Sequence, residues 1–117
     1  MKVKISSKEF DCVNVFCNEL AFSIDDAVKV LDCYNELSII ILGGDILNNQ
    51  LKHNYDNWYY NISNNLSNDQ NIKQSIDVAR KYLLNYIKKN GSDYYCVFVL
   101  QKPKPVRCQS VDGCREA

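Results

Sequence analysis

Hydrophobic residues recur at helical spacing in two segments of the chain. In the first segment they stand at positions i, i+3, i+4 and i+7: Ile24, Ala27, Val28 and Leu31. Ser23 precedes them, and Asp26 follows Ser23 by three residues, a pattern typical of a capped helix start. In the second segment the apolar positions are Ile72, Ile76, Ala79, Leu83, Tyr86 and Ile87. We therefore predict two amphipathic helices, one of about three turns after Ser23 and one over residues 69–90 that ends at Gly91.

A run of consecutive apolar residues follows the first helical segment. Residues 38–42 are largely β-branched, which is typical of a strand covered on both sides. We expect this strand to stop at Gly43-Gly44-Asp45, because two glycines permit a bulge or a sharp turn. The apolar pair after it, Ile46 and Leu47, allows the strand to resume.

Two more segments have the composition of strands. Residues 55–60 are rich in aromatic side chains and predict a strand paired antiparallel with the preceding one. Residues 94–100 are apolar on both faces and predict a second central strand. Residues 1–22 show only weak alternation and predict no definite element. The pattern as a whole predicts an α+β fold, a small mixed or antiparallel sheet with two amphipathic helices packed on it.

Composition fits one globular domain. The chain has 117 residues, of which 46% are hydrophobic and 24% charged. We assign residues 1–102 to a single domain and residues 103–117 to a flexible C-terminal tail, because both prolines and several charges occur there without any apolar period. No segment resembles a signal peptide or is long enough to span a bilayer, so we expect a cytoplasmic protein without a membrane partner.

The net charge of zero argues against direct binding of nucleic acid, but it conceals an asymmetry. Residues 9–56 contain nine acids and two bases, a balance of −7, whereas residues 73–107 contain eight bases and two acids, a balance of +6. Two readings stay open: solvated helix faces that happen to differ, or an acidic surface that attracts a basic partner. The acids that we place on that surface are Asp25, Asp26 and Asp32.

The residues of the chain assemble no recognisable catalytic or metal site. The six cysteines lack the close spacing of a zinc site, and His53 is the single histidine. We expect reduced thiols, with Cys33 and Cys96 in the core, and assign no role to Cys108 and Cys114. A Gly-Gly-Asp sequence after a strand resembles the hairpin of diguanylate cyclases, but the acid and phenylalanine of that motif are missing here. We therefore expect no cofactor, no metal and no catalysis.

The richest candidate for a binding surface is the aromatic strand and its acidic neighbours. Large rings concentrate there, and tyrosine and tryptophan dominate the energetics of protein interfaces. About half of the rings would face the core, and the outward set would contact a partner. We expect two acids to lie beside the rings if the two strands pair. The candidate partner-binding residues are Asp45, Tyr55, Asp56, Trp58, Tyr59 and Tyr60.

Four short motifs, in this order and spacing, resemble the immunity protein 40 family of bacterial polymorphic toxin systems. They are Leu20-Ala21-Phe22-Ser23, Ile41-Leu42-Gly43-Gly44-Asp45, Tyr55-Asp56-Asn57-Trp58-Tyr59, and Ser75 with Ala79-Arg80-Lys81-Tyr82. The resemblance covers roughly residues 20–100. It carries over Asp45 and Trp58, together with Gly43, Gly44 and Asn57 as structural positions. The resemblance implies an α+β protein, encoded beside a secreted toxin, that protects the producing cell by binding that toxin.

The residues taken alone leave other functions open. A regulatory or adaptor module would use the same aromatic surface on an endogenous protein, and an enzyme would be built on Asp45 or a reactive cysteine. If the partner is a toxin of the nuclease class, its substrate-binding face is basic and the acidic half of this chain complements it. The sequence leaves the toxin's identity, the blocking of its active site and the oligomeric state undetermined.

Overall fold

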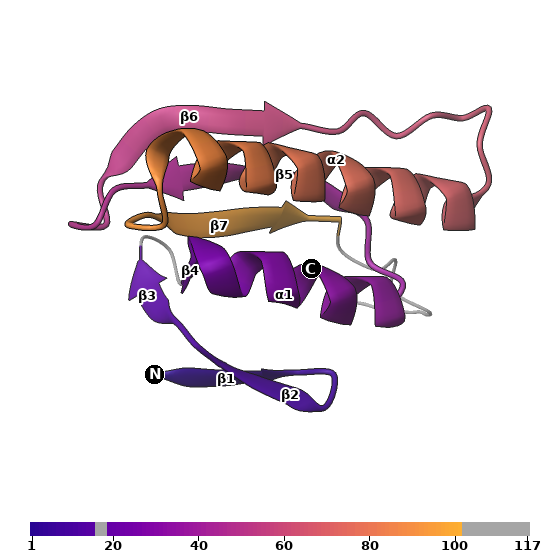
Figure 1. Cartoon of the computed structure of the whole chain (residues 1–117). Helices are drawn as coiled ribbons and strands as arrows, with labels where there is room; N and C mark the ends of the chain where they lie inside the picture. Colours follow the sequence, from indigo (N-terminus) through magenta and orange to yellow (C-terminus); the bar gives the residue numbers. More distant parts are fainter. Residues whose placement is uncertain (16–18, 102–117) are drawn as a thin grey trace, which may run out of the picture.

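The computed structural model describes residues 1–15 and 19–101. In this part of the chain two helices lie in front of an antiparallel sheet (Figure 1). The elements are β1 (Lys2–Ile5), β2 (Lys8–Asp11), β3 (Val13–Val15), β4 (Glu19–Ser23), α1 (Ile24–Glu36), β5 (Ile41–Leu47), β6 (His53–Tyr59), α2 (Asn68–Asn90) and β7 (Tyr95–Leu100). The expected α+β class, with two amphipathic helices packed on an antiparallel sheet, is confirmed.

Five strands form the main sheet in the order β3-β4-β7-β5-β6, and every neighbouring pair is antiparallel. The last of the described strands, β7, lies between β4 and β5 at the centre, as the apolar pattern of residues 94–100 predicts. The strand β6 lies at one edge and β3 at the other. The expected antiparallel pairing of β5 with β6 is confirmed.

Both helices bury their apolar sides against the same face of the sheet. Ile24 and Leu31 from α1 and Leu83 from α2 are completely or almost completely removed from solvent. They pack with aromatic side chains of the sheet, among which Phe22 and Phe98 lie with their ring centroids 6.2 Å apart. Burial of this apolar surface is the main stabilising contribution to the fold.

Both helices start at a capping serine, and the predicted start after Ser23 is confirmed. The side chain of Ser23 accepts a hydrogen bond of 3.3 Å from the backbone N–H of Asp26. At the start of α2, Ser67 and Gln70 form a reciprocal capping box, with bonds of 3.1 Å and 2.9 Å. Each cap satisfies N–H groups that have no partner within the helix.

The prediction that the strand after the first helix stops at the double glycine is wrong. The strand β5 starts only at Ile41 and continues through both glycines to Leu47. Residues 38–40 precede the strand, and Ser38 has a positive φ of 58°. The two glycines do not end the strand. They are present because β6 packs closely against them. The register irregularities lie between Ile41 and Gly43 and between Asp45 and Leu47.

The N-terminal region contains elements that the sequence left unassigned. The strands β1 and β2 form a separate two-stranded sheet, which lies on the side of α1 away from α2 (Figure 1). Ile5 and Phe10 from this hairpin are buried and belong to the main core. The predicted C-terminal tail, residues 103–117, lies outside the described residues, as do Cys108 and Cys114.

The first residue of β5 is held by α2. The buried hydroxyl of Ser75 accepts a 3.0 Å hydrogen bond from the backbone N–H of Ile41 and donates one of 2.9 Å to the carbonyl of Ile72. This N–H lies next to the register irregularity of β5. The α2 helix therefore takes the place of a missing strand partner at this position.

Replacing this hydroxyl should destabilise the protein. The Ser75→Ala variant leaves the buried N–H of Ile41 without its partner, so we expect the free energy of unfolding to fall by about 1–3 kcal/mol. Urea unfolding followed by circular dichroism measures this change. Ser6→Ala, which removes an exposed hydroxyl bonded to Glu36, should change stability by less than about 0.5 kcal/mol; equal losses in both variants would contradict the special role of Ser75.

Candidate partner-binding surface

The main sheet has a second face, opposite the two helices, which we call the helix-free face. Strand alternation assigns its residues, because Cys96 and Phe98 point to the helices and their neighbours in β7 point away. A small buried cluster lies at its centre and consists of Ala21, Leu47 and Val97, with Val15, Leu51 and Tyr95 partly buried against it. Toward β6 this face becomes more exposed and more polar, through Asp45, Asn57 and Tyr59.

The charges of the main sheet have a single sign. Its five strands contain three carboxylates, Glu19, Asp45 and Asp56, and no lysine or arginine. Glu19 and Asp45 belong to the helix-free face, because their cross-strand partners are Val15 and Val97. A partner that approaches this face therefore meets aromatic, aliphatic, polar and acidic side chains from the strands, but no lysine or arginine.

A pocket of about 200 Å³ opens over Gly43 on this face, and we call it the Gly43 pocket. Gly43 pairs with Tyr59 on one side and with Val99 on the other, and the pocket is lined by both of these residues. Tyr59 is 77% exposed and Val99 is 43% exposed. Half-buried Asp45, two residues along β5 on the same face, also lines the pocket.

Both glycines are required by the approach of Trp58 and its backbone. A Cβ atom on Gly43 would lie 2.3 Å from the carbonyl oxygen of Trp58, and the φ of Gly43 is +157°. A Cβ atom on Gly44 would lie 2.3 Å from the indole ring of Trp58, on the helix side of the sheet. Gly43 therefore forms the floor of the pocket on the helix-free face, and Gly44 leaves room for the indole ring of Trp58 on the helix side.

Trp58 itself is not part of the exposed surface. Its side chain is only 5% exposed and lies against Tyr82, at 5.0 Å between ring centroids, and against Phe98, at 6.1 Å. Its indole N–H has no hydrogen-bond partner among the described residues. The sequence placed Trp58 among the partner-binding residues, but the structure shows its ring in the core of the free protein. Alternation explains this, because Trp58 and Tyr59 point to opposite faces.

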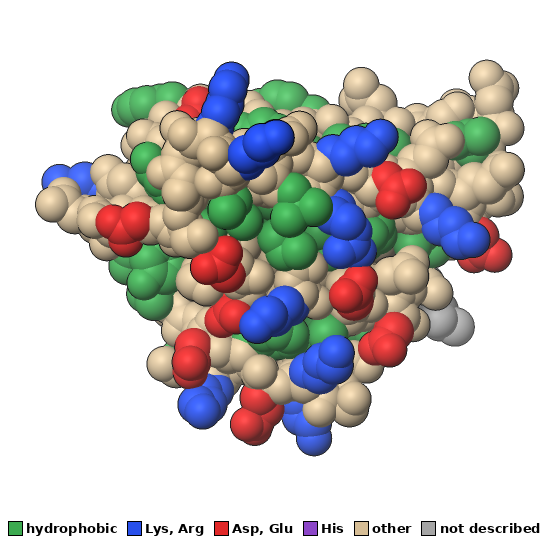
Figure 2. All heavy atoms as spheres, viewed as in Figure 1, with side chains coloured by type: hydrophobic (Ala, Val, Ile, Leu, Met, Phe, Trp, Pro, Cys, Tyr) green, Lys and Arg blue, Asp and Glu red, His purple; other side chains and the backbone are tan. Residues whose placement is uncertain are grey.

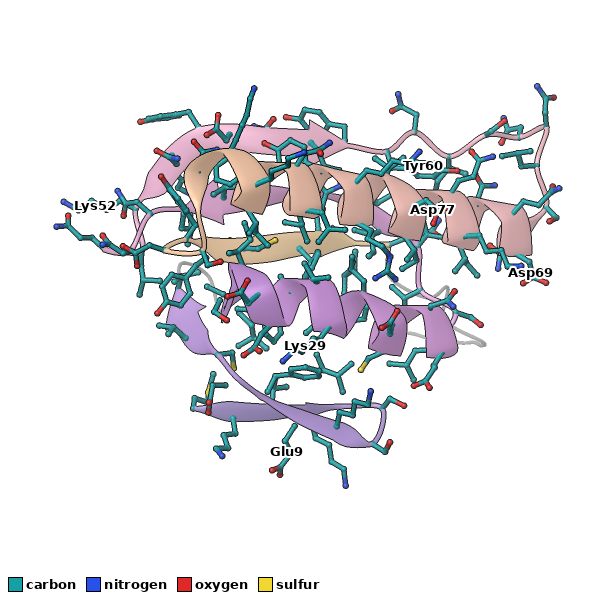
Figure 3. All side chains as sticks on the ribbon, in the orientation of Figure 1. Glu9, Lys29, Lys52, Tyr60, Asp69 and Asp77 are labelled. Atoms are coloured by element: carbon teal, nitrogen blue, oxygen red, sulfur yellow. The ribbon has the colours of Figure 1, made fainter. Side chains whose placement is uncertain are left out.

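Two other members of the predicted set are engaged inside the molecule. The hydroxyl of Tyr60 donates a 2.7 Å hydrogen bond to the side-chain oxygen of buried Asn71, and Figure 3 shows Tyr60 beside α2. Asp56 is exposed but accepts a 2.7 Å bond from the hydroxyl of Tyr86. These contacts fasten the edge strand β6 and the segment after it to α2.

Tyr86 connects two side chains of β6. Its hydroxyl accepts a 2.7 Å hydrogen bond from Asn54 in addition to the one it donates to Asp56. Burial, together with the bond to Asp56, raises the pKa of Tyr86 above its ordinary value. Burial also raises the pKa of neighbouring Tyr82, with Asp56 as a smaller cause.

The Tyr86→Phe variant should lower the free energy of unfolding by about 1 kcal/mol at neutral pH, because it removes both bonds to β6. It should also change the response to alkali. The unfolded chain releases the Tyr86 proton near pH 10, before the folded protein does, so stability declines as the pH rises above 10. The variant should lose less stability than the wild type between pH 10 and 11 in urea titrations; parallel losses would contradict this account.

Tyr55 is the most exposed aromatic residue among those described. It is 91% exposed and has a positive φ of 60°, within the stretch of β6 where the register with β5 shifts. An irregularity of this kind at an edge strand hinders continuous pairing with another strand. Tyr55 therefore remains available to a partner through its side chain.

The predicted site residues Asp25, Asp26 and Asp32 belong to α1 and do not line the Gly43 pocket. Asp32 forms a 2.8 Å ion pair with Arg80 of α2, and Asp25 accepts a 3.0 Å bond from Ser92. Asp26 is half-buried at the helix start. Figure 2 shows acidic and basic side chains interspersed over the helix side, so the charge asymmetry of the sequence does not produce a uniformly acidic surface there.

The structure thus brings together part of the predicted set and adds one residue. Asp45, Asn57 and Tyr59 share the helix-free face, and Tyr55 extends the exposed surface along β6. Val99 was missed, because its strand looked covered on both faces from the sequence. Its exposure could have been inferred from its position opposite Gly43, because a glycine does not cover the residue paired with it.

The buried thiols offer no reactive group on this surface. Cys12, Cys33 and Cys96 are buried, in agreement with the predicted core positions of the latter two. Burial raises the pKa of Cys33 and of Cys96, which disfavours the nucleophilic thiolate. Among residues 1–15 and 19–101, no group of three potential metal-ligating side chains comes together. No helix in the same residues is long and apolar enough to cross a membrane.

Comparison with known proteins gives one match. A search of curated proteins and a search of solved structures each returned no match. Residues 9–100 match the family model of immunity protein 40, a range that contains eight of the nine described elements in whole or almost in whole, from β2 to β7. The range also includes the double glycine, the Gly43 pocket and the whole of the main sheet. The chain therefore belongs to the immunity protein 40 family.

Proposed function

We propose that this chain is an immunity protein that binds a cognate polymorphic toxin in the cytoplasm of the producing cell and neutralises it. The observation that carries the proposal is the exposed Tyr59 beside Asp45 and the Gly43 pocket, on a sheet whose strands contain no lysine or arginine. Membership of the immunity protein 40 family supports a toxin as the partner. Such a function requires binding and no chemistry of its own.

The exposed side chains fit the demands of tight protein recognition. Aromatic rings such as Tyr55 and Tyr59 provide large contact area with few rotatable bonds, and they slow dissociation when a partner buries them. Carboxylates such as Asp45 favour a partner of opposite charge and exclude acidic ones. A nuclease toxin, whose substrate-binding surface is basic, would meet these requirements.

The acids of α1 have a different part in this proposal. Asp25 and Asp32 bond to Ser92 and to Arg80 of α2, and Asp26 lies at the start of α1, so none of the three lines the Gly43 pocket. We expect them to contribute to the long-range attraction of a basic toxin and therefore to the association rate. Buried Trp58 contributes indirectly, because it positions the strand that carries Tyr59.

Co-expression tests the proposal. The toxin domain to use is the C-terminal domain of the secreted protein encoded next to this chain, expressed from an inducible promoter with and without the immunity protein. We expect growth to be restored only when both are present, and the two purified proteins to form a stable complex by size-exclusion chromatography. Growth arrest despite abundant folded immunity protein, together with no complex, would refute the assignment.

A further inference from the structure

We infer that the Gly43 pocket receives a cationic side chain of the toxin, arginine in particular; this inference rests on the proposed function. The pocket offers three complementary surfaces to such a group. Asp45 supplies the negative charge, the exposed ring of Tyr59 supplies an aromatic face, and Val99 supplies an apolar wall for the aliphatic stem. Gly43, which lies between Tyr59 and Val99 in the sheet, forms the floor of the pocket.

The cross-strand register places these groups within reach of one ligand. Tyr59 lies directly opposite Gly43, and Asn57 lies directly opposite Asp45, so Tyr59 and Asp45 are diagonal neighbours. Diagonal neighbours in an antiparallel pair are about 7–8 Å apart, a separation that a guanidinium group between them can bridge. A cation within about 6 Å of an aromatic ring centre is attracted to its face.

Charge favours a cation over other occupants of this pocket. Asp45 is the acidic residue that lines it, and the strands around it carry no lysine or arginine that would already pair with it. A larger hollow of about 450 Å³ beside Tyr86 differs in this respect, because Lys89 and Asp56 both line it. The charges of Lys89 and Asp56 compensate each other in that hollow, whereas no basic residue lines the Gly43 pocket to compensate Asp45.

Arginine fits the pocket better than lysine does. Its planar guanidinium group stacks on an aromatic ring while donating hydrogen bonds to a carboxylate in the same plane, and it is less strongly hydrated than an ammonium group. The pocket has a volume of about 200 Å³ and is open to solvent at the surface of the sheet. The aliphatic stem of a long side chain can therefore enter it along Val99.

The test is an affinity measurement with four variants and a catalytically inactive form of the neighbouring toxin domain. Asp45→Asn and Tyr59→Ala should each weaken binding by about 10-fold or more, because central contacts of an interface carry most of its affinity. Tyr59→Phe keeps the aromatic face and should stay within about threefold of the wild type. Asp77→Asn removes an exposed acid of α2, on the helix side in Figure 3, and should have no effect.

The double variant and salt provide an internal check. If both residues hold the same cation, Asp45→Asn combined with Tyr59→Ala should lose less affinity than the product of the single losses. The dependence of affinity on salt should be weaker for Asp45→Asn than for the wild type. Thermal unfolding of each variant, close to that of the wild type, shows that the fold is retained.

An arginine scan of the toxin then identifies the occupant. One toxin Arg→Ala variant should bind the wild-type immunity protein about 10-fold more weakly and become insensitive to Asp45→Asn. Wild-type affinity in both Asp45→Asn and Tyr59→Ala would overturn the inference while the proposed function stands. So would a change in self-association without a change in toxin binding, or a gain of affinity after deletion of residues 103–117, since each assigns the pocket to another occupant. Failure of the wild type to bind the toxin would instead refute the proposed function.

Discussion

Gly43→Ala should be among the most damaging single substitutions in the described part of the chain, with a loss of about 2–5 kcal/mol in the free energy of unfolding. The added methyl group would lie 2.3 Å from the carbonyl oxygen of Trp58, which belongs to the backbone of β6 and cannot rotate away. The strands β5 and β6 would have to separate at this point. The positive φ of Gly43 adds strain in the same variant.

Gly91→Ala provides the matched control. Gly91 also has a positive φ, +88°, but a Cβ atom there would meet nothing within 4 Å. Its replacement should therefore cost only the backbone strain, about 1–2 kcal/mol. Chemical denaturation of both variants measures the difference, which isolates the steric clash. If Gly43→Ala were no more destabilising than Gly91→Ala, the close approach of the two strands would not be what requires a glycine.

Trp58→Ala should destabilise the protein by about 3–5 kcal/mol, because it removes the largest ring of the core between Gly44 and Tyr82 and leaves a cavity. A typical domain of this size has only about 5–15 kcal/mol of stability, so the variant should be near its unfolding threshold at 37 °C. Denaturant unfolding followed by far-ultraviolet circular dichroism is the appropriate measurement, since the variant lacks tryptophan fluorescence.

The adjacent residue provides the comparison for this prediction. Tyr59→Ala removes a ring of similar size that is 77% exposed, so its stability should stay within about 0.5 kcal/mol of the wild type. The two variants therefore separate folding from binding: Trp58→Ala should fail to protect cells because it unfolds, and Tyr59→Ala because it binds weakly. A stable Trp58→Ala protein that fails to bind toxin would contradict the packing role given to Trp58.

The helices were predictable from sequence because their signals are local. The apolar period of 3.6 residues and the caps at Ser23 and Ser67 depend only on neighbouring residues. The same holds for the central position of β7, which its continuous apolar run indicates. These local features are sufficient to predict the α+β class without any tertiary contact.

The path of β5 was not predictable by the same reasoning. A double glycine normally indicates a turn, but here it stays extended because Trp58 of the neighbouring strand occupies the space of the missing side chains. That cause lies 14 residues away in sequence and acts only once β5 and β6 pair. The hairpin of β1 and β2 was missed for a related reason, since its strands are four residues long and mostly polar.

The sequence predicted the candidate site as one continuous segment of the chain, whereas the residues that share a face in the structure come from three neighbouring strands. The sequence grouped aromatic residues by proximity along β6, but alternation sends Tyr59 to the helix-free face and Trp58 to the core. Asp45 was correctly expected beside the rings if β5 and β6 paired. Asp56 and Tyr60 are held by α2 through contacts that no local pattern indicates.

The placement of the last strand at the centre of the sheet has a consequence for synthesis. A chain that leaves the ribosome from its N-terminus exposes the inner edges of β4 and β5 until residues 95–100 have emerged to fill the space between them. A translation product that ends before Tyr95 would keep two unpaired edges and an incomplete core. Such fragments would be cleared or would aggregate, so only copies translated through Leu100 would have a complete sheet.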